Sequence, residues 1–250
     1  MGSIIEVFRG RPAAGRRSAA RAAWRHTPVP GSGVARVRAA RLEDYAAIRA
    51  LRRDLRAASW TLKHFESQRH AFPEGQLVAE SGGEIVGAAS CLVVDWDAHA
   101  LAPTARGVTG EGYFSTHDPS GGTLYGDEIL ADPQRHGATV TRALCQAQRR
   151  LARKLNLRRI IDAVRVPGYQ AARERMSPER YAHHVILGDI GDTQLALLTG
   201  QGFQYCGIIR DYRPEDSESC GHAALVVWLN PFFSPGEPPA SMETERRKCA

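Results

Sequence analysis

The sequence predicts an α/β fold (α+β) with about seven strands, and three observations support this prediction. Between Val34 and Leu229 the residue patterns follow the order β-α-α-β-β-β-α-β-α-β-β. The middle of that order, Thr123 to Leu157, has the pattern of a strand, a tight turn and a long amphipathic helix. With 43% hydrophobic and 24% charged residues over 250 positions, the chain has enough apolar material for a core. No apolar run approaches the ~20 residues that cross a bilayer, so no membrane partner is expected.

The distribution of charge predicts an arm, one domain and a tail. The first 41 residues hold nine arginines against one acid, Glu6, a net +8 that leaves −2 for the rest of a chain of net charge +6. We expect a basic, disordered arm at residues 1–33, a domain at 34–231 and a tail at 232–250. Such an arm can bind nucleic acid or direct a protein to an organelle. It carries no known binding motif, so a solvated arm is favoured and no nucleic-acid partner is expected.

The first elements follow from periodicity and from residues that break helices. The alternating segment from Val34 to Ala40 predicts a strand, and a helix should follow it because apolar residues recur at helical spacing at Leu42, Tyr45, Ile48, Leu51 and Leu55. A second helix is expected over residues 60–71, because the pair Phe72-Pro73 disfavours its continuation. A hairpin across Ser81-Gly82-Gly83 should join strands at residues 76–80 and 84–95.

A long insertion precedes the central strand and helix. Residues 96–122 are polar and rich in glycine and proline, and a connection of this length is more often functional than a simple link. The central helix follows a turn around Asp132-Pro133. Its apolar stripe recurs every three to four residues, at Val140, Leu144, Ala147, Leu151 and Leu155.

The last elements alternate strand and helix. A strand is expected over residues 158–164, and Ser177 followed by Pro178 is a strong helix start, with an end near Gly188. Asp192 should cap a short helix that ends at Leu198. Two strands, at residues 204–210 and 222–229, complete the domain.

The start of the central helix is the first candidate binding site. Its N-terminal N–H groups have no partner within the helix, and with the helix dipole they form a site for phosphate. We expect the small residues Gly137, Ala138 and Thr139 to lie in the turn before it. Neither G-x-G-x-x-G nor G-x-x-x-x-G-K-[ST] occurs here, which argues against a dinucleotide or a Walker-type triphosphate.

This segment resembles the coenzyme A loop of the GNAT acetyltransferase superfamily, a strand followed by [QR]-x-x-G-x-[GA] and a helix. His136 stands at the first position of that pattern, and Thr139 and Thr141 replace both glycines. The element order and a helix-GF-strand ending at Gly202-Phe203 are also similar to the family. The phrases AFPEGQ, GYFSTHDP, LYGDE, LNLRRI, MSPERY and DYRPEDSES resemble more closely the GNAT domain that many bacteria fuse to a carbon–nitrogen hydrolase (nitrilase-like) domain.

The resemblance implies a GNAT fold, with a mixed central sheet of about seven strands and helices on both faces. It also implies acetyl-CoA as cosubstrate, with the thioester oxygen held by backbone N–H groups at the splayed end of the central strand. The implied coenzyme A residues are Leu130, Ala131, His136, Gly137, Ala138, Thr139, Val140, Thr141 and Arg142.

Two acids on the central strand are the candidate catalytic residues. Acetyl transfer to an amine requires a base for the ammonium proton, and the family often uses an acid on this strand. Glu128 is the first candidate and Asp127 the second. Alternatively, both carboxylates face solvent or a cross-strand arginine. The family's usual tyrosine acid would stand at Leu198, so the sequence identifies no general acid.

The remaining reactive side chains predict no further site. The five cysteines are scattered without C-x-x-C pairs, which indicates neither a disulfide framework nor a zinc site, and favours a reducing cytoplasm. His183 and His184 are adjacent on a helix and face different directions, so no metal site is expected.

The prediction is therefore an acetyl-CoA-dependent N-acetyltransferase acting on a primary amine of a small molecule or protein. The alternative is a catalytically degenerate GNAT-like domain that binds acyl-CoA or a protein. The resemblance implies a homodimer or a nitrilase-like partner.

Overall fold

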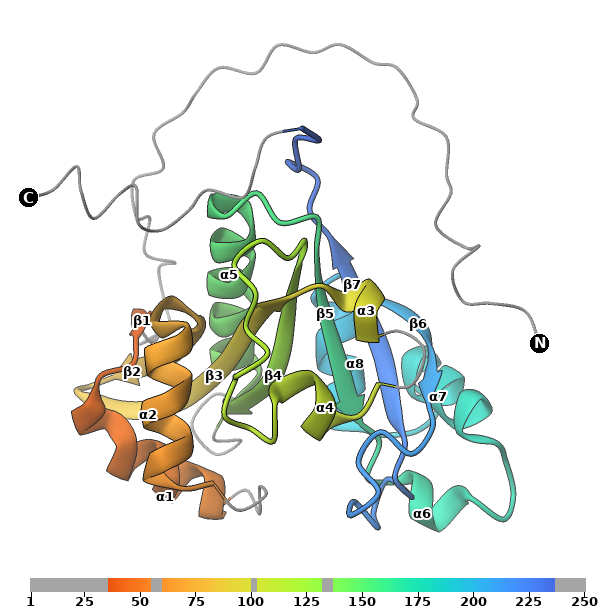
Figure 1. Ribbon diagram of the computed structural model, residues 1–250. Helices are drawn as coiled ribbons and strands as arrows, with labels where there is room; N and C mark the ends of the chain where they lie inside the picture. Colours follow the sequence, from red (N-terminus) through yellow and green to blue (C-terminus); the bar gives the residue numbers. More distant parts are fainter. Residues whose placement is uncertain (1–35, 55–59, 100–102, 132–136, 237–250) are drawn as a thin grey trace, which may run out of the picture. The chain divides into compact units, whose positions relative to one another are not determined.

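The domain is built on one seven-stranded sheet. The computed structural model describes residues 36–54, 60–99, 103–131 and 137–236. Within them the strands lie side by side in the order β1-β2-β3-β4-β5-β7-β6 (Figure 1). Their bounds are β1 Arg36–Ala39, β2 Gln76–Ser81, β3 Glu84–Val94, β4 Thr123–Ala131, β5 Arg159–Arg165, β6 Gln204–Ile209 and β7 Ala223–Leu229.

The sheet is mixed because one neighbouring pair is parallel. β4 and β5 run in the same direction, and every other neighbouring pair is antiparallel. A parallel pair needs a crossover, which α5 provides with Gly137–Lys154. The predicted mixed sheet of seven strands is confirmed.

Helices cover both faces of the sheet, as Figure 1 shows. On one face lie α1, α2, α3 and α4, with bounds Tyr45–Asp54, Leu62–Ala71, Trp96–His99 and Ala105–Thr109. The other face carries α5, α7 and α8, the last two at Pro178–Leu187 and Thr193–Gly200. Short helical turns complete the domain at Leu42–Asp44, Pro73–Gly75 and Tyr169–Ala172 (α6).

The core lies on both faces because strand residues alternate between them. In β4, Leu124 packs in the cluster under α5 and α8, whereas Tyr125 packs with Trp96 and Phe114 on the opposite face. The predicted apolar stripe of α5 is buried at Val140, Leu144, Ala147, Leu151 and Leu155. Burial of such a stripe is the main stabilising contribution of an amphipathic helix.

Local signals located the later helices well. Ser177 caps α7 by accepting from the Arg180 N–H, and Gly188 ends the helix with φ +84°, a conformation that favours glycine. Asp192 precedes α8 as predicted, but its side chain makes no capping bond and instead accepts from the Tyr181 hydroxyl at 3.1 Å.

Several element ends differ from the predictions by one or two residues, and two larger differences bear on the site. The α5 helix already begins at Gly137, so Gly137, Ala138 and Thr139 belong to its first turn rather than to the preceding loop. The insertion at residues 96–122 is not wholly irregular, because α3 and α4 lie within it.

Some predictions fall on residues outside the described ranges. These are the arm at 1–33, the loop residues 132–136 that include His136, and the tail beyond residue 236. Across the described ranges, no helix combines the length and apolarity that a bilayer span requires.

Candidate active site

The two parallel strands separate halfway along their length. β4 pairs with β5 only from Thr123 opposite Arg159 to Gly126 opposite Asp162. Beyond this point β4 continues to pair with β3, and β5 with β7. We call the resulting separation, between residues 127–131 of β4 and 163–165 of β5, the wedge. No described strand pairs with its two inner edges, which therefore present backbone groups to an extended ligand.

A β-bulge lies at the point where the wedge begins. In β3, Ser90 faces Glu128 and Cys91 faces Gly126, so Asp127 is an extra residue in β4. A bulge disrupts alternation and redirects side chains. Ser90 Oγ donates to Asp127 Oδ2 at 3.4 Å, and Ser90 and Glu128 line the same pocket. The bulge thus places two consecutive carboxylates on the face of the sheet that α1 and α2 cover.

Each of these carboxylates pairs with an arginine from a distant segment. Glu128 Oε2 forms an ion pair with Arg52 Nη1 of α1. Asp127 Oδ1 lies 3.5 Å from Arg213 Nη2, in the loop between β6 and β7. The two acids are therefore on the central strand, as predicted, and each pairs with an arginine that comes from a helix or a loop rather than from a neighbouring strand.

Burial affects the two arginines differently. Burial lowers the pKa of Arg52 to about 10, with Arg213 adding to this effect and Asp127 opposing it. For Arg213, burial is again the largest cause and acts to lower the pKa, but Asp127, Tyr125, Tyr212 and Glu215 together outweigh it, and the pKa is raised. Both groups remain cations at neutral pH, so the cluster contains two positive and two negative charges.

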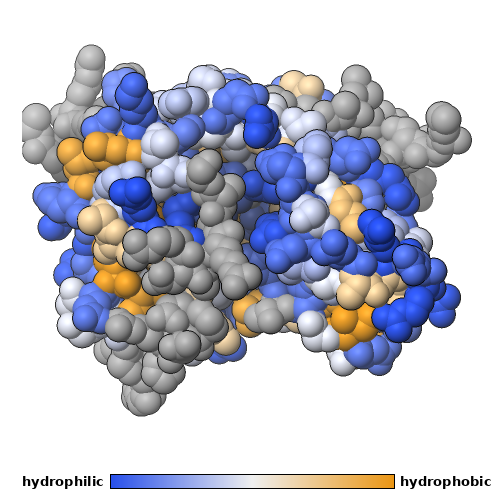
Figure 2. Space-filling view, turned by 90° about the horizontal axis from the view of Figure 1, so that it is seen from below, coloured by the Kyte–Doolittle hydropathy of each residue, from blue (hydrophilic) through white to orange (hydrophobic). Residues whose placement is uncertain are grey.

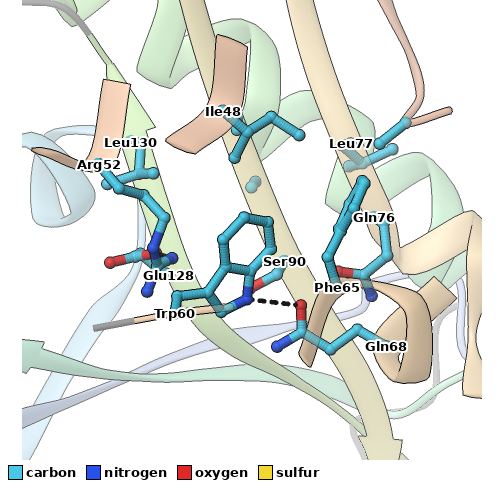
Figure 3. A pocket seen from close by; sticks show the side chains of 13 residues that line it. Ile48, Arg52, Trp60, Phe65, Gln68, Gln76, Leu77, Ser90, Glu128 and Leu130 are labelled. Atoms are coloured by element: carbon cyan, nitrogen blue, oxygen red, sulfur yellow. Dashed lines mark hydrogen bonds and ion pairs between the residues drawn. The ribbon is translucent and has the colours of Figure 1, made fainter. Parts of the chain in front are cut away.

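A pocket opens beside Glu128 between α1, α2 and the sheet, and Figure 3 shows its lining. Its polar groups are Arg52, Gln68, Gln76, Ser90 and Glu128. Its apolar wall is formed by Ala40, Ile48, Trp60, Phe65, Leu77, Ala88, Ala89 and Leu130. The lining combines an apolar wall with a few convergent polar groups, as in small-molecule sites, but its volume of about 20 Å³ holds only about one water-sized molecule.

The insertion supports one wall of this pocket. The Trp60 indole N–H donates to Gln68 Oε1 at 3.2 Å, and Gln68 Nε2 donates to the Gly112 carbonyl at 2.8 Å. Ser67 Oγ donates to the Tyr113 carbonyl at 2.7 Å. The insertion is thereby fixed to α2, which contributes Phe65 and Gln68 to the pocket.

The predicted coenzyme A residues occupy two places. Leu130 is buried and lines the pocket, while Ala131 ends β4 beside the wedge. From Gly137 to Arg142 the residues form the first turns of α5, whose leading N–H groups have no partner within the helix. Val140 and Thr141 are buried there, Thr139 is half-buried, and Ala138 and Arg142 are exposed. The Thr141 side chain is thus enclosed in the protein, and His136 lies outside the described residues.

Seen from below in Figure 2, the molecule presents the end of the sheet at which β4 and β5 separate. This face is mostly hydrophilic, with small separate apolar groups, and it is hollowed near its middle (Figure 2). Such a surface suits a polar ligand that enters toward the sheet.

No tyrosine takes the place of the absent general acid at Leu198. Leu198 is buried on α8. Tyr205 is half-buried with a hydroxyl that has no hydrogen-bond partner, and burial raises its pKa to about 12. Tyr125 and Tyr212 bond to each other through their hydroxyls. Among the described residues there is also no group of three or more His, Cys, Asp or Glu side chains that could hold a metal ion.

Sequence reasoning missed Arg52, Arg213 and Asp162. The two arginines reach the acids from segments 75 or more residues away along the chain, so no local spacing indicates them. Asp162 is buried on β5 beside Gly126, where β4 and β5 last pair. One signal was available: Asp162 interrupts the apolar strand RIIDAVR, and a buried acid is unusual in such a strand.

Comparisons with known proteins agree with this geometry. The model of the "Acetyltransferase (GNAT) family" matches residues 45–175. The chain is 34% identical over 176 residues to the "Probable hydrolase YhcX" of Bacillus subtilis, covering 70% of this chain and 34% of that protein, so it spans about a third of that relative's length. It is 28% identical over 174 residues to the "Uncharacterized N-acetyltransferase YkwB" of the same organism, covering 70% of this chain and 76% of that protein.

Solved structures show the same architecture. The GphF GNAT-like decarboxylase in complex with isobutyryl-CoA is 27% identical with a TM-score of 0.65, covering 78% of this chain and 99% of that chain. The loading GNATL domain of CurA from Lyngbya majuscula has a TM-score of 0.67 at 18% identity, covering 78% of this chain and 98% of that chain. With its sheet, its wedge and a family match over more than half of its length, this chain belongs to the acetyltransferase (GNAT) family.

Proposed function

We propose that this protein is an N-acetyltransferase that transfers the acyl group of acetyl-CoA to a primary amine of a small molecule or protein. The observation that best supports this proposal is the bulge at Asp127, because it links the wedge to the pocket. It lies where the wedge begins, and it directs Glu128 into a pocket on the α1 and α2 face. An acyl donor in the wedge and an amine in the pocket would therefore meet at Glu128.

The donor side fits coenzyme A in two respects. The inner edges of the wedge can hydrogen-bond an extended pantetheine arm in the manner of an added strand. At its outer end the 18-residue α5 presents its N-terminus, where backbone N–H groups and the helix dipole favour phosphate. Family members use acyl-CoA, and the GphF structure contains isobutyryl-CoA.

The acceptor side fits an amine with an apolar body. The apolar wall can enclose such a body, while Glu128 accepts a proton from the amine directly or through water. The amine nitrogen attacks the thioester carbon and the carbon–sulfur bond breaks with its electron pair on sulfur. The amine proton leaves to Glu128, and the thiolate takes a proton from solvent. Because Arg52 pairs with Glu128, we expect the acceptor to displace or share that ion pair.

Calorimetric titration with acetyl-CoA, followed by measurement of thiol release with a panel of primary amines, tests the proposal. We expect binding by the parent and by the Thr139→Gly/Thr141→Gly variant, because the Thr141 side chain is already buried. The two glycines should lower stability by about 0.5–1 kcal/mol each. If neither protein binds acetyl-CoA at millimolar concentration, the acyltransferase proposal is wrong. The alternative of a degenerate domain acting through a protein would then replace it.

Decarboxylation of an acyl-CoA is the second candidate function. GphF is named a GNAT-like decarboxylase, and it matches this chain over 99% of its own length at 27% identity. Arg52 could pair with the carboxylate of a malonyl-type thioester, although only by leaving Glu128. Release of CO2 from malonyl-CoA without any amine would favour this candidate. Amine-dependent thiol release from acetyl-CoA favours the first.

The proposed protein partner is a nitrilase-like hydrolase domain, with a homodimer as the alternative. The observation behind it is that the matched region covers 34% of YhcX, which is named a probable hydrolase. Sedimentation of the purified chain, alone and mixed with a nitrilase-like protein, would distinguish a homodimer from a complex with the hydrolase.

A further inference from the structure

A buried acid lies at the closed end of the wedge. Asp162 is 6% exposed, and its Oδ2 has no hydrogen-bond partner among the described residues. It faces Gly126 on the last rung that joins β5 to β4, one residue before the bulge at Asp127. A Cβ atom at position 126 would lie 2.3 Å from Asp162 Oδ1. The carboxyl group therefore lies directly over the Gly126 backbone.

A second polar side chain is unsatisfied on the adjacent helix. Gln148 of α5 is fully buried, and within the part of the chain that the structure describes neither its Nε2 nor its Oε1 has a hydrogen-bond partner. Gln148 lies one turn from Cys145 on the same face of α5. Burial raises the pKa of the Cys145 thiol to about 12, and the nearby Asp162 carboxyl adds to the effect. Buried polar groups without partners are rare in proteins, and a missing ligand is one physical reason for them.

Asp162 is a hydrogen-bond donor as well as an acceptor. Burial, and then the charge of Asp127, raise the pKa of Asp162 well above its usual value, which favours the neutral carboxyl over the carboxylate. The other titratable groups that act on it electrostatically are Cys91, Cys145 and Tyr212, and burial keeps all three protonated. Among the described residues, Asp127 is the charged group that acts on the pKa of Asp162, and its negative charge opposes ionisation.

The position of Asp162 determines which part of a ligand it would contact. Glu128 is two residues beyond Gly126, about 7 Å along the strand. If Glu128 receives the amine proton, the reacting thioester lies near the level of the bulge. The group over Gly126 then faces the sulfur end of the cosubstrate, and the phosphates lie at the far end near α5.

We infer that Asp162 binds the thioester end of acyl-CoA, with its buried carboxyl group donating a hydrogen bond to that part of the pantetheine arm. The inference rests on the proposed use of acyl-CoA and assigns a residue to it. A role of Asp162 in ligand binding can be distinguished by experiment from a role in packing alone. An unsatisfied buried acid destabilises the fold, so its replacement by an apolar residue of similar size should stabilise the protein.

The test compares acetyl-CoA affinity with thermal stability in the full chain. Asp162→Val removes the donor, and we expect acetyl-CoA affinity to fall about tenfold, the usual effect of one lost hydrogen bond in a dry site, while the melting temperature stays the same or rises. Asp162→Asn keeps a donor, so we expect its affinity to stay within about threefold of the parent. As a matched control, Asp192→Asn changes a buried acid whose carboxylate bonds to Tyr181, and its affinity should equal that of the parent.

A pH series covers the case in which Asp162→Val fails to fold. The parent should lose affinity for acetyl-CoA relative to Asp162→Asn as pH rises, because an ionised Asp162 cannot donate and the amide still can. The inference is overturned if the parent binds acetyl-CoA and Asp162→Val binds it equally well. It is likewise overturned if the ratio of affinities between the parent and Asp162→Asn is constant with pH. A parent that does not bind acetyl-CoA instead contradicts the proposed function itself.

Discussion

At the scale of single residues, one extra residue in a strand determines the character of the site. Without the bulge, Asp127 and Glu128 would point to opposite faces of β4. With it, both lie on the face of α1 and α2, and each meets an arginine. Such neutralised clusters cost less to bury than isolated charges. They also leave Glu128 at the edge of a pocket, where an acceptor can reach it.

Glu128→Gln should lower turnover by a factor of about 10²–10⁴, the usual contribution of a general base, with little change in acetyl-CoA affinity. The loss should shrink as pH rises, because the amine then deprotonates without help. Turnover rates with a verified amine across the pH range measure the loss of activity, and calorimetry measures the acetyl-CoA affinity. The control is Glu80→Gln on β2, which removes an acid paired with Arg38 away from the pocket. Equal rates for Glu128→Gln and the parent at every pH would exclude Glu128 as the base.

Asp162→Asn should be more stable than the parent, by a margin that grows with pH. The pKa of Asp162 is raised in the folded protein, so the folded state binds more protons than the unfolded state above the usual pKa of 3.8. The parent therefore loses stability as pH rises from about 4 toward the raised pKa, whereas asparagine does not titrate. Urea unfolding of both proteins at pH 4 and pH 8 measures the difference.

The Asp118→Asn variant is a control, because its stability relative to the parent should change with pH in the opposite direction. Hydrogen bonds from Ser120 lower the pKa of Asp118, so its carboxylate contributes stability above the usual pKa that is lost as pH falls. Relative to the parent, Asp118→Asn should therefore become less stable as pH rises. An equal pH dependence for Asp162→Asn and the parent would contradict the neutral state assigned to Asp162.

At the scale of elements, the pairing of β4 with β5 ends at Gly126 opposite Asp162, and the two strands separate beyond these residues. Gly126 leaves room for the Asp162 carboxyl at the end of the paired segment, and the bulge follows at once. The α5 helix then fills the crossover and presents its N-terminus near the ends of both strands (Figure 1). The strand pair and the helix together form the donor side of the site.

Gly126→Ala should destabilise the fold by about 1–3 kcal/mol, because the new methyl group overlaps the Asp162 carboxyl. In an Asp162→Ala background the same change should cost less, since the clash is absent. Gly122→Ala is the matched control: nothing lies within 4 Å of its added Cβ, so a change within about 0.5 kcal/mol is expected. Denaturant unfolding of the parent, Gly126→Ala, Asp162→Ala and the double variant measures the coupling free energy between the two positions. Equal costs in both backgrounds would show that the carboxyl does not occupy this space.

At the scale of the whole molecule, the sheet lies between the N-terminus of α5 and the pocket of α1 and α2. On one face α5 begins beside the wedge, and on the other α1 and α2 enclose the pocket. Under the proposed function the donor and the acceptor approach from different sides and meet where the sheet opens.

A chain beginning at Gly33 should melt like the full chain. Residues 1–33 offer almost no apolar periodicity, so they cannot offset the entropy of ordering. Thermal unfolding of both chains by circular dichroism measures this. A decrease of many degrees would show that the arm packs on the domain. A steep salt dependence of nucleic-acid binding, lost on the same deletion, would instead identify the arm as a binding module.

Much of the fold was predictable because its signals are local. The hairpin of β2 and β3, the stripe of α5 and the ends of α7 each depend on residues within about a dozen positions. Ser177 and Gly188 mark a helix through their own backbone preferences, which hold in any tertiary context. The resemblance of longer phrases then indicated how these elements are ordered in one sheet.

The sequence by itself determined the seven strands, the central strand and helix, and two acids on that strand as candidates. Only the tertiary structure decided that Asp127 occupies a bulge, that Arg52 and Arg213 neutralise the pair, and that Asp162 is buried over Gly126. The physical reason is the distance along the chain between the residues that interact. Helix and strand formation follows from neighbouring residues, whereas the register of β3 against β4 and the burial of a charge depend on segments brought together only when the sheet forms.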